Sequence, residues 1–123
     1  MGYKEYFLSY KVELYKDKNG KEPVAQFLKS LPAKHKAKAF KIIGLLEEFG
    51  RDIKMPYALH FEDELWELRI KQASDISRIF YFAEVDKSFV LLHGFVKKSQ
   101  KTPKKEIDKA KKYLVDHKRR YCK

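Results

Sequence analysis

The chain has 123 residues, of which 44% are hydrophobic and 15% aromatic, enough apolar material for one packed domain and too much for a disordered chain. A single cysteine, Cys122, excludes an internal disulfide, and no long apolar run or signal-peptide start stands out, so we expect a cytoplasmic protein without membrane contact. The net charge of +11 is uneven, because residues 97–123 carry 12 basic and 3 acidic side chains whereas residues 1–96 carry 16 and 14. Such a field attracts polyanions, above all nucleic acid, although a solvated helix face can carry the same charge.

A strand and a short helix are predicted first. Residues 9–15 read SYKVELY, and their alternation places Tyr10, Val12 and Leu14 on one face. After a polar turn, residues 22–31 form the predicted helix, because Pro23 suits a first helical position.

A longer helix and a loop follow. Pro32 restarts the helical pattern, which ends near Phe49 with Gly50 as the terminating residue. The apolar stripe of this helix consists of Ala39, Ile42, Leu46 and Phe49, widened by Ile43 and Leu45. Residues 51–64 read as a loop, in which His60 is expected to be structural.

The second half of the chain predicts a meander and a final helix. Residues 65–70, 77–84 and 88–96 read as three antiparallel strands, with turns at residues 74–75 and 86–87. Thr102 and Pro103 signal the start of the last helix. Its apolar stripe is Ile107, Ala110 and Leu114. One α+β domain over residues 1–123 is the simplest arrangement.

Cations inside strands are the feature of this sequence that asks for a functional explanation. In the first strand of the meander, alternation separates two sets of side chains, Leu65, Glu67 and Arg69 on one face and Trp66, Leu68 and Ile70 on the other. The second set is apolar and is expected to face the core. Glu67 and Arg69 are therefore expected on an open face of the sheet.

The next two strands add cations but leave their faces undecided. Arg78 is in phase with Phe80, yet both faces of its strand are apolar. One alternating face of the last strand consists of His93, Phe95 and Lys97. Lys98 belongs to the other face, unless a bulge near Gly94 changes the register. Which of the two lysines faces inward stays open.

Several chemistries find no support in the sequence. The single cysteine and the four histidines show no spacing typical of zinc sites, and no glycine-rich phosphate loop or nucleophile-elbow motif is present. We therefore expect no metal and no cofactor.

A cationic sheet face suits RNA. Arginine grips phosphate through a planar fork, and exposed Phe80 or Phe95 could stack on an unpaired base. RNA carries its own nucleophile, the 2′-hydroxyl, so a protein can cleave it without metal. The protein must activate that hydroxyl, stabilise the added phosphorane charge and protonate the leaving 5′-oxygen. The residues expected to bind RNA are Lys71, Phe80, Phe95, Lys101, Lys104 and Lys105. The alternative is a surface ion pair between Arg69 and Glu67 or a neighbouring acid, worth about 0–1 kcal/mol.

Three segments, LWELRI, RIFYF and VLLHGFVKKSQKTPKKEIDKA, together resemble the RelE/ParE superfamily of toxins, in its HigB-like branch. The resemblance implies a small twisted, mainly antiparallel sheet of about four strands, with two N-terminal helices packed on one face and a basic C-terminal helix. It implies a ribosome-dependent, metal-independent messenger RNA endonuclease (mRNA interferase) of a type II toxin-antitoxin system. The implied partners are a HigA-like helix-turn-helix antitoxin, the ribosome with its mRNA, and operator DNA reached through the antitoxin complex.

The resemblance also implies roles for individual residues. Arg69 and Arg78 match the strand cations that grip phosphate and stabilise the transition state, and Lys97 or Lys98 matches the proton donor. The general base stays open, because RelE-like toxins carry a lysine where Glu67 stands and a late tyrosine without a clear match here. Glu67 and His93 are the two candidates for that base.

Two other functions remain open. A ParE-like inhibitor of DNA gyrase could share the fold without cleaving RNA, because a fold does not fix a function. A basic module that only binds nucleic acid through the final helix would also account for the charge.

Overall fold

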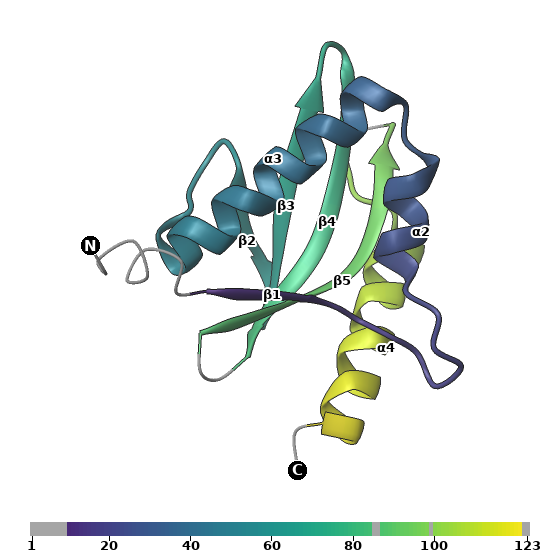
Figure 1. The fold of residues 1–123 in the computed structure, drawn as a ribbon. Helices are drawn as coiled ribbons and strands as arrows, with labels where there is room; N and C mark the ends of the chain where they lie inside the picture. The colour runs from purple at the N-terminus through teal and green to yellow at the C-terminus, as the bar shows by residue number, and fades with distance from the viewer. Residues whose placement is uncertain (1–9, 85–86, 99, 122–123) are drawn as a thin grey trace, which may run out of the picture.

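The computed structural model describes residues 10–84, 87–98 and 100–121, which form a five-stranded mixed sheet with helices on both faces (Figure 1). The strands are β1 (Lys11–Leu14), β2 (Ala58–Glu62), β3 (Leu65–Gln72), β4 (Asp75–Glu84) and β5 (Ser88–Lys97). They lie in the order β1-β5-β4-β3-β2, with β1 parallel to β5 and the other neighbouring pairs antiparallel. The predicted α+β class and the β3–β4–β5 meander are confirmed.

The described residues contain three α-helices, α2 (Pro23–Ser30), α3 (Ala33–Phe49) and α4 (Lys104–Tyr121), and a short 3-10 turn, η1 (Gly50–Asp52). Prolines set two of the starts, because Pro23 lies in the first turn of α2 and Pro32 is the N-cap of α3. Gly50 ends α3 with a φ of 54°, and a Cβ there would lie 2.3 Å from the ring of Tyr10. The starts of all three helices and the ends of α2 and α3 are confirmed to within two residues.

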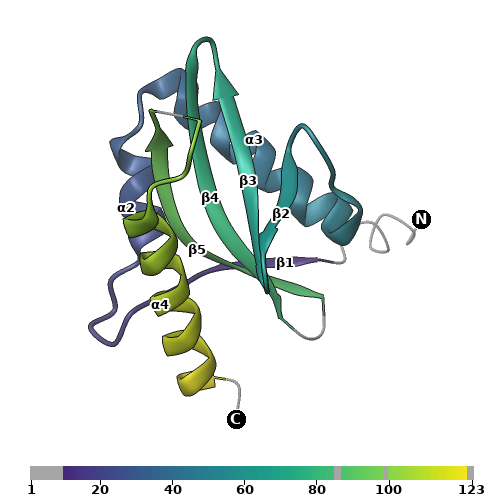
Figure 2. The same ribbon diagram turned by 180° about the vertical axis from the view of Figure 1, so that it is seen from behind.

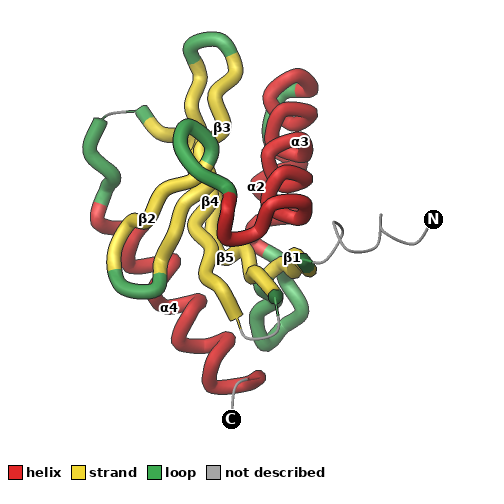
Figure 3. The backbone as a smooth tube through the Cα atoms, turned by 90° about the vertical axis from the view of Figure 1, so that its left-hand side faces the viewer, coloured by secondary structure: helices red, strands yellow, loops and turns green. Residues whose placement is uncertain are grey.

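The sheet separates two layers of helices. Figures 2 and 3 show α2 and α3 on one side of the sheet and α4 on the other. On the α3 side, Leu68, Ile70 and Ile79 are fully buried against both N-terminal helices. On the α4 side, a second buried cluster joins the strands to Ala110 and Leu114 of α4. The face that was expected to be open is therefore covered over part of its length.

Two architectural predictions were wrong, the number of strands and the loop at residues 51–64. The sheet is mixed and has five strands among the described residues, because residues 51–64 contain the short edge strand β2. The two N-terminal helices lie on one face as predicted, and α4 lies on the opposite face, a position that the prediction did not give. Ser9, Asp86 and Cys122, on which other predictions rest, lie outside the described residues.

The faces of β3 also differ from prediction near its start. Glu67 is 2% exposed because the α4-side cluster covers its face, and Trp66, expected in the core, is 37% exposed. Trp66 borders a pocket of about 170 Å³ on the α3 side instead. Phe49, at the end of α3, is likewise 45% exposed. Burial of Glu67 and exposure of Trp66 and Phe49 therefore depend on tertiary packing and not on the alternation of the strand or the helical stripe.

A bulge in β5 resolves the register that the sequence left open. Phe80 pairs with His93 and Tyr81 with Leu91, so Leu92 is an extra residue in the ladder. Leu92 packs in the α4-side cluster, and His93 contacts Glu106 of the same helix. The bulge lies two residues before Gly94 and turns two consecutive side chains toward α4.

Helix α4 is held to the sheet by ion pairs as well as by its apolar stripe. Lys111 Nζ lies 2.5 Å from Glu62 Oε2, and Lys118 pairs with Glu64. Near the end of the helix, His117 Nε2 lies 2.6 Å from Glu84 Oε2. Part of the basic charge of α4 is thus matched by acids of β2, β4 and the turn between β2 and β3. None of the helices in the described residues is long and apolar enough to cross a membrane.

Candidate functional site

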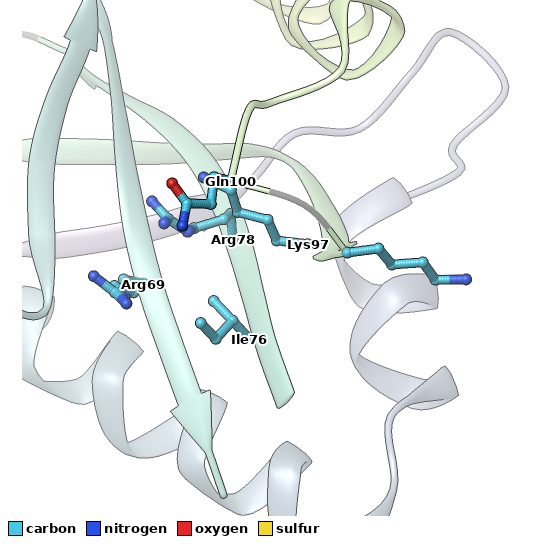
Figure 4. Close-up of a pocket in the computed structure, with 6 residues that line it drawn as sticks. Arg69, Ile76, Arg78, Lys97 and Gln100 are labelled. Atoms are coloured by element: carbon cyan, nitrogen blue, oxygen red, sulfur yellow. The ribbon is translucent and has the colours of Figure 1, made fainter. Parts of the chain in front are cut away.

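A cationic pocket lies at the edge of the sheet where β3 and β5 end and β4 begins. It has a volume of about 480 Å³, is open to solvent, and is lined by Arg69, Ile76, Arg78, Lys97, Lys98 and Gln100 (Figure 4). Arg69 is opposite Arg78 on the neighbouring strand, and Ile76 is opposite Lys97. Residues opposite one another project to the same face of a sheet, so the register of three strands gathers the charges.

The guanidinium of Arg78 is held by Glu67, which lies on the side of Arg78 away from the pocket. Both side chains are buried, with Arg78 7% and Glu67 2% exposed, and Arg78 Nη1 donates a hydrogen bond to Glu67 Oε1. Glu67 Oε2 and Arg78 Nε are buried without a hydrogen-bond partner among the described residues. Glu67 is not part of the pocket wall. The expected surface ion pair of Arg69 is replaced by a buried ion pair of Arg78.

Burial and neighbouring charges shift the pKa values of Glu67 and Lys97. Burial raises the pKa of the Glu67 carboxyl above its ordinary value, and the nearby cations Arg78, Lys97 and Arg69 oppose that rise. Burial and the positive charge of Arg78 lower the pKa of Lys97, with a further contribution from Arg69 and opposition from Glu67. The charges of Arg78, Arg69 and Glu67 therefore act on Lys97, and its ammonium releases a proton more readily than that of an exposed lysine.

Lys98 and the predicted RNA-binding lysines lie at the surface. Lys98 lines the pocket and is exposed. Lys71 is opposite Ile76 in the ladder, which places it on the pocket side of β3. Lys101, Lys104 and Lys105 are exposed where α4 begins, and Lys104 Nζ lies 2.9 Å from Asp108 Oδ2. These lysines extend the positive charge from the pocket along the segment that leads into α4.

His93 is set apart from the pocket. It is 8% exposed, its Nε2 lies 2.7 Å from Glu106 Oε1, and its ring stacks on Phe95 at a centroid distance of 5.9 Å. Burial lowers its pKa, and Glu106 opposes that effect. His93 does not line the pocket. The structure brings neither of the two candidate bases to the pocket wall.

The expectation that Phe80 or Phe95 is exposed for base stacking was wrong. Phe80 is fully buried and Phe95 is 5% exposed. The ring of Phe80 lies 5.1 Å from that of Phe61 and 5.7 Å from that of Phe95, centroid to centroid. Both rings belong to the core beneath α4, because α4 covers the face of the sheet that was expected to be open.

Sequence reasoning missed two residues of the pocket wall. Ile76 is in phase with Arg78 on β4, so the same alternation that placed Arg78 could have found it. Gln100 lies between β5 and α4, where no periodic pattern exists to place a side chain. The part of the chain that the structure describes holds no group of three or more His, Cys, Asp or Glu side chains suited to a metal ion.

Most of this chain matches the model of a known protein family. The model of the family described as Phage derived protein Gp49-like (DUF891) matches residues 26–115, which is more than half of the chain. The chain belongs to the Gp49-like family. This family is associated with RelE-like toxins, and the matched region contains all six residues of the cationic pocket. No curated protein matches the chain.

Proposed function

We propose that this Gp49-like chain is the toxin of a type II toxin-antitoxin system, HigB-like in type, and that it cleaves mRNA on the ribosome. The observation that carries the proposal is the convergence of Arg69, Arg78 and Lys97 in one open pocket whose acidic residue, Glu67, lies behind the wall. A phosphodiester is the anion that such a set of cations fits best, since arginine forks match its oxygens. A helix-turn-helix antitoxin and operator DNA complete the proposed set of partners.

The proposed reaction is an internal transfer within the RNA. The 2′-oxygen attacks the neighbouring phosphorus, the bond between phosphorus and the 5′-oxygen breaks, and a 2′,3′-cyclic phosphate and a 5′-hydroxyl end are formed. Arg78 and Arg69 stabilise the charge that develops on the phosphorane oxygens. The Lys97 ammonium gives its proton to the leaving 5′-oxygen. The 2′-hydroxyl gives its proton to solvent water, because the proposal assigns no base among the side chains of the pocket wall.

This chemistry is tested by removing the nucleophile. An mRNA with a single 2′-deoxy nucleotide at the cleaved position, held in a purified translating ribosome, is expected to stay intact while its all-ribose counterpart is cut. The deoxy substitution leaves the phosphate and its negative charge in place, so binding in the pocket is preserved. Equal cleavage of the two messages would rule out attack by the 2′-hydroxyl.

The role of Lys97 predicts a pH dependence. The proton donor must be charged, so the cleavage rate is expected to fall as the pH rises through the lowered pKa of Lys97. In Lys97→Arg the side chain stays protonated throughout, because a guanidinium pKa lies above about 12. This variant should be slower at every pH and should show no alkaline decline. Single-turnover rates between pH 6 and 10 measure both effects, and an unchanged alkaline decline in Lys97→Arg would assign it to another group.

A further inference from the structure

A buried carboxylate directly behind a cationic pocket is unusual and calls for a physical explanation. Glu67 lies on β3 with its side chain on the same face as Arg69, opposite Phe80 of β4. Its neighbours on this face, Leu65 and Phe80, are fully buried apolar residues. An apolar side chain would suit this position without the desolvation that a charged carboxylate suffers.

A contribution to stability does not readily explain why Glu67 and Arg78 form a buried ion pair. Replacing a buried ion pair by apolar residues of similar volume is often neutral or stabilising, so the presence of Glu67 and Arg78 is weak grounds for a stabilising role. What the carboxylate does achieve is to fix the far end of a long and otherwise mobile side chain. An unrestrained arginine loses considerable rotamer entropy when it binds a ligand, and a preorganised one loses less.

The manner of the contact leaves the guanidinium free for a second anion. Glu67 accepts from Arg78 through one oxygen and one N–H group, whereas a bidentate pair would take two N–H groups. Arg78 is at the same time part of the pocket wall, which Glu67 is not. Arg78 thus bridges the buried carboxylate on one side and the open pocket on the other.

We infer that Glu67 is a positioning residue that fixes the guanidinium of Arg78 for a phosphodiester in the pocket, and that it is not the base that removes the 2′-hydroxyl proton. This inference rests on the proposed function and deepens it, since it assigns a role to the acid that stands closest to the cationic site. A base must reach the hydroxyl by hydrogen bond or through one water, and a carboxylate behind the wall does not meet that requirement.

The test compares two substitutions of the same residue. Glu67→Gln keeps a carbonyl oxygen that can accept from Arg78 but cannot take up a proton as a carboxylate does. Glu67→Ala removes the acceptor. Glu62→Gln on the neighbouring strand β2, where the acid pairs with Lys111, is the matched control for the loss of one negative charge. Circular dichroism and thermal unfolding show which variants fold.

Single-turnover cleavage on programmed ribosomes between pH 5 and 9 is the first readout. Glu67→Gln is expected within about fivefold of wild type, with an unchanged acidic limb, while Glu67→Ala loses about 100-fold, the loss typical of a misplaced charge-stabilising donor. The double variant Glu67→Ala/Arg78→Ala should be no slower than Arg78→Ala, because both changes act through one guanidinium. Loss of activity and of the acidic limb in Glu67→Gln would instead identify Glu67 as the base.

Binding of an RNA oligonucleotide that carries 2′-O-methyl groups throughout separates this inference from the proposed function. Glu67→Ala and Arg78→Ala are expected to weaken binding alike, and Glu67→Gln and Glu62→Gln to preserve it. If the wild-type protein cleaves no RNA, the proposed function fails and this binding series still decides the role of Glu67. Wild-type affinity in Glu67→Ala would overturn the inference.

Discussion

Arg78→Ala is expected to lower the rate of mRNA cleavage by about 100- to 1,000-fold, the effect of removing one preorganised donor from a transition state that gains negative charge. Arg78 is 7% exposed, lines the pocket, and is the pocket cation that Glu67 holds by a hydrogen bond, so its loss removes a fixed donor. In cells the same change should abolish growth arrest. Cleavage of a ribosome-bound message by the purified variant measures the effect directly.

Two further variants separate charge from position and folding. Arg119→Ala removes the same charge from an exposed site near the end of α4 and is expected to leave cleavage within about twofold. Arg78→Lys keeps a cation beside Glu67 but lacks the planar fork, so an intermediate loss of rate is expected. Full activity in a folded Arg78→Ala protein would contradict the assignment of the site.

Phe80→Ala is expected to lower the free energy of unfolding by about 3–5 kcal/mol, because a large ring would leave a cavity in the core beneath α4. Phe80 is fully buried and packs against the rings of Phe61 and Phe95. Such a loss is a large share of the stability of a domain of this size. Denaturant unfolding followed by circular dichroism measures it.

Phe40→Ala on α3 is the matched control, because the same ring is 55% exposed there and its removal should change stability by less than about 0.5 kcal/mol. A Phe80→Ala protein with native stability but weakened RNA binding would restore the stacking role that the sequence suggested. A large loss of stability would confirm that the aromatic residue belongs to the core.

Local signals accounted for much of the fold. Pro23, Pro32 and Gly50 mark helix ends through their own backbone restrictions, so the sequence alone places α2 and α3 closely. The meander of β3, β4 and β5 follows from alternating apolar runs separated by turn residues. The edge strand β2 was missed because its five residues, ALHFE, mix apolar, basic and acidic side chains and owe their strand conformation to pairing with β3.

The sequence predicted which charged residues form the candidate site, but it did not predict which of them are buried. Alternation correctly placed Glu67 and Arg69 on one face of β3. It could not reveal that Glu67 is buried beside Leu65 and Phe80, whereas Arg69 lines the open pocket. Which side chain is buried on a two-faced strand depends on tertiary packing, and no local pattern contains that information.

The measurement that tests the central claim most directly is the mapping of transcript 5′ ends shortly after induction, in wild type beside an Arg69→Ala/Arg78→Ala variant. We predict new 5′ ends in phase with codons, confined to translated regions and lost in the variant. Cuts in untranslated RNA as well would indicate a ribonuclease that acts without the ribosome. Growth arrest with DNA damage and no new 5′ ends would contradict the account and favour a gyrase inhibitor.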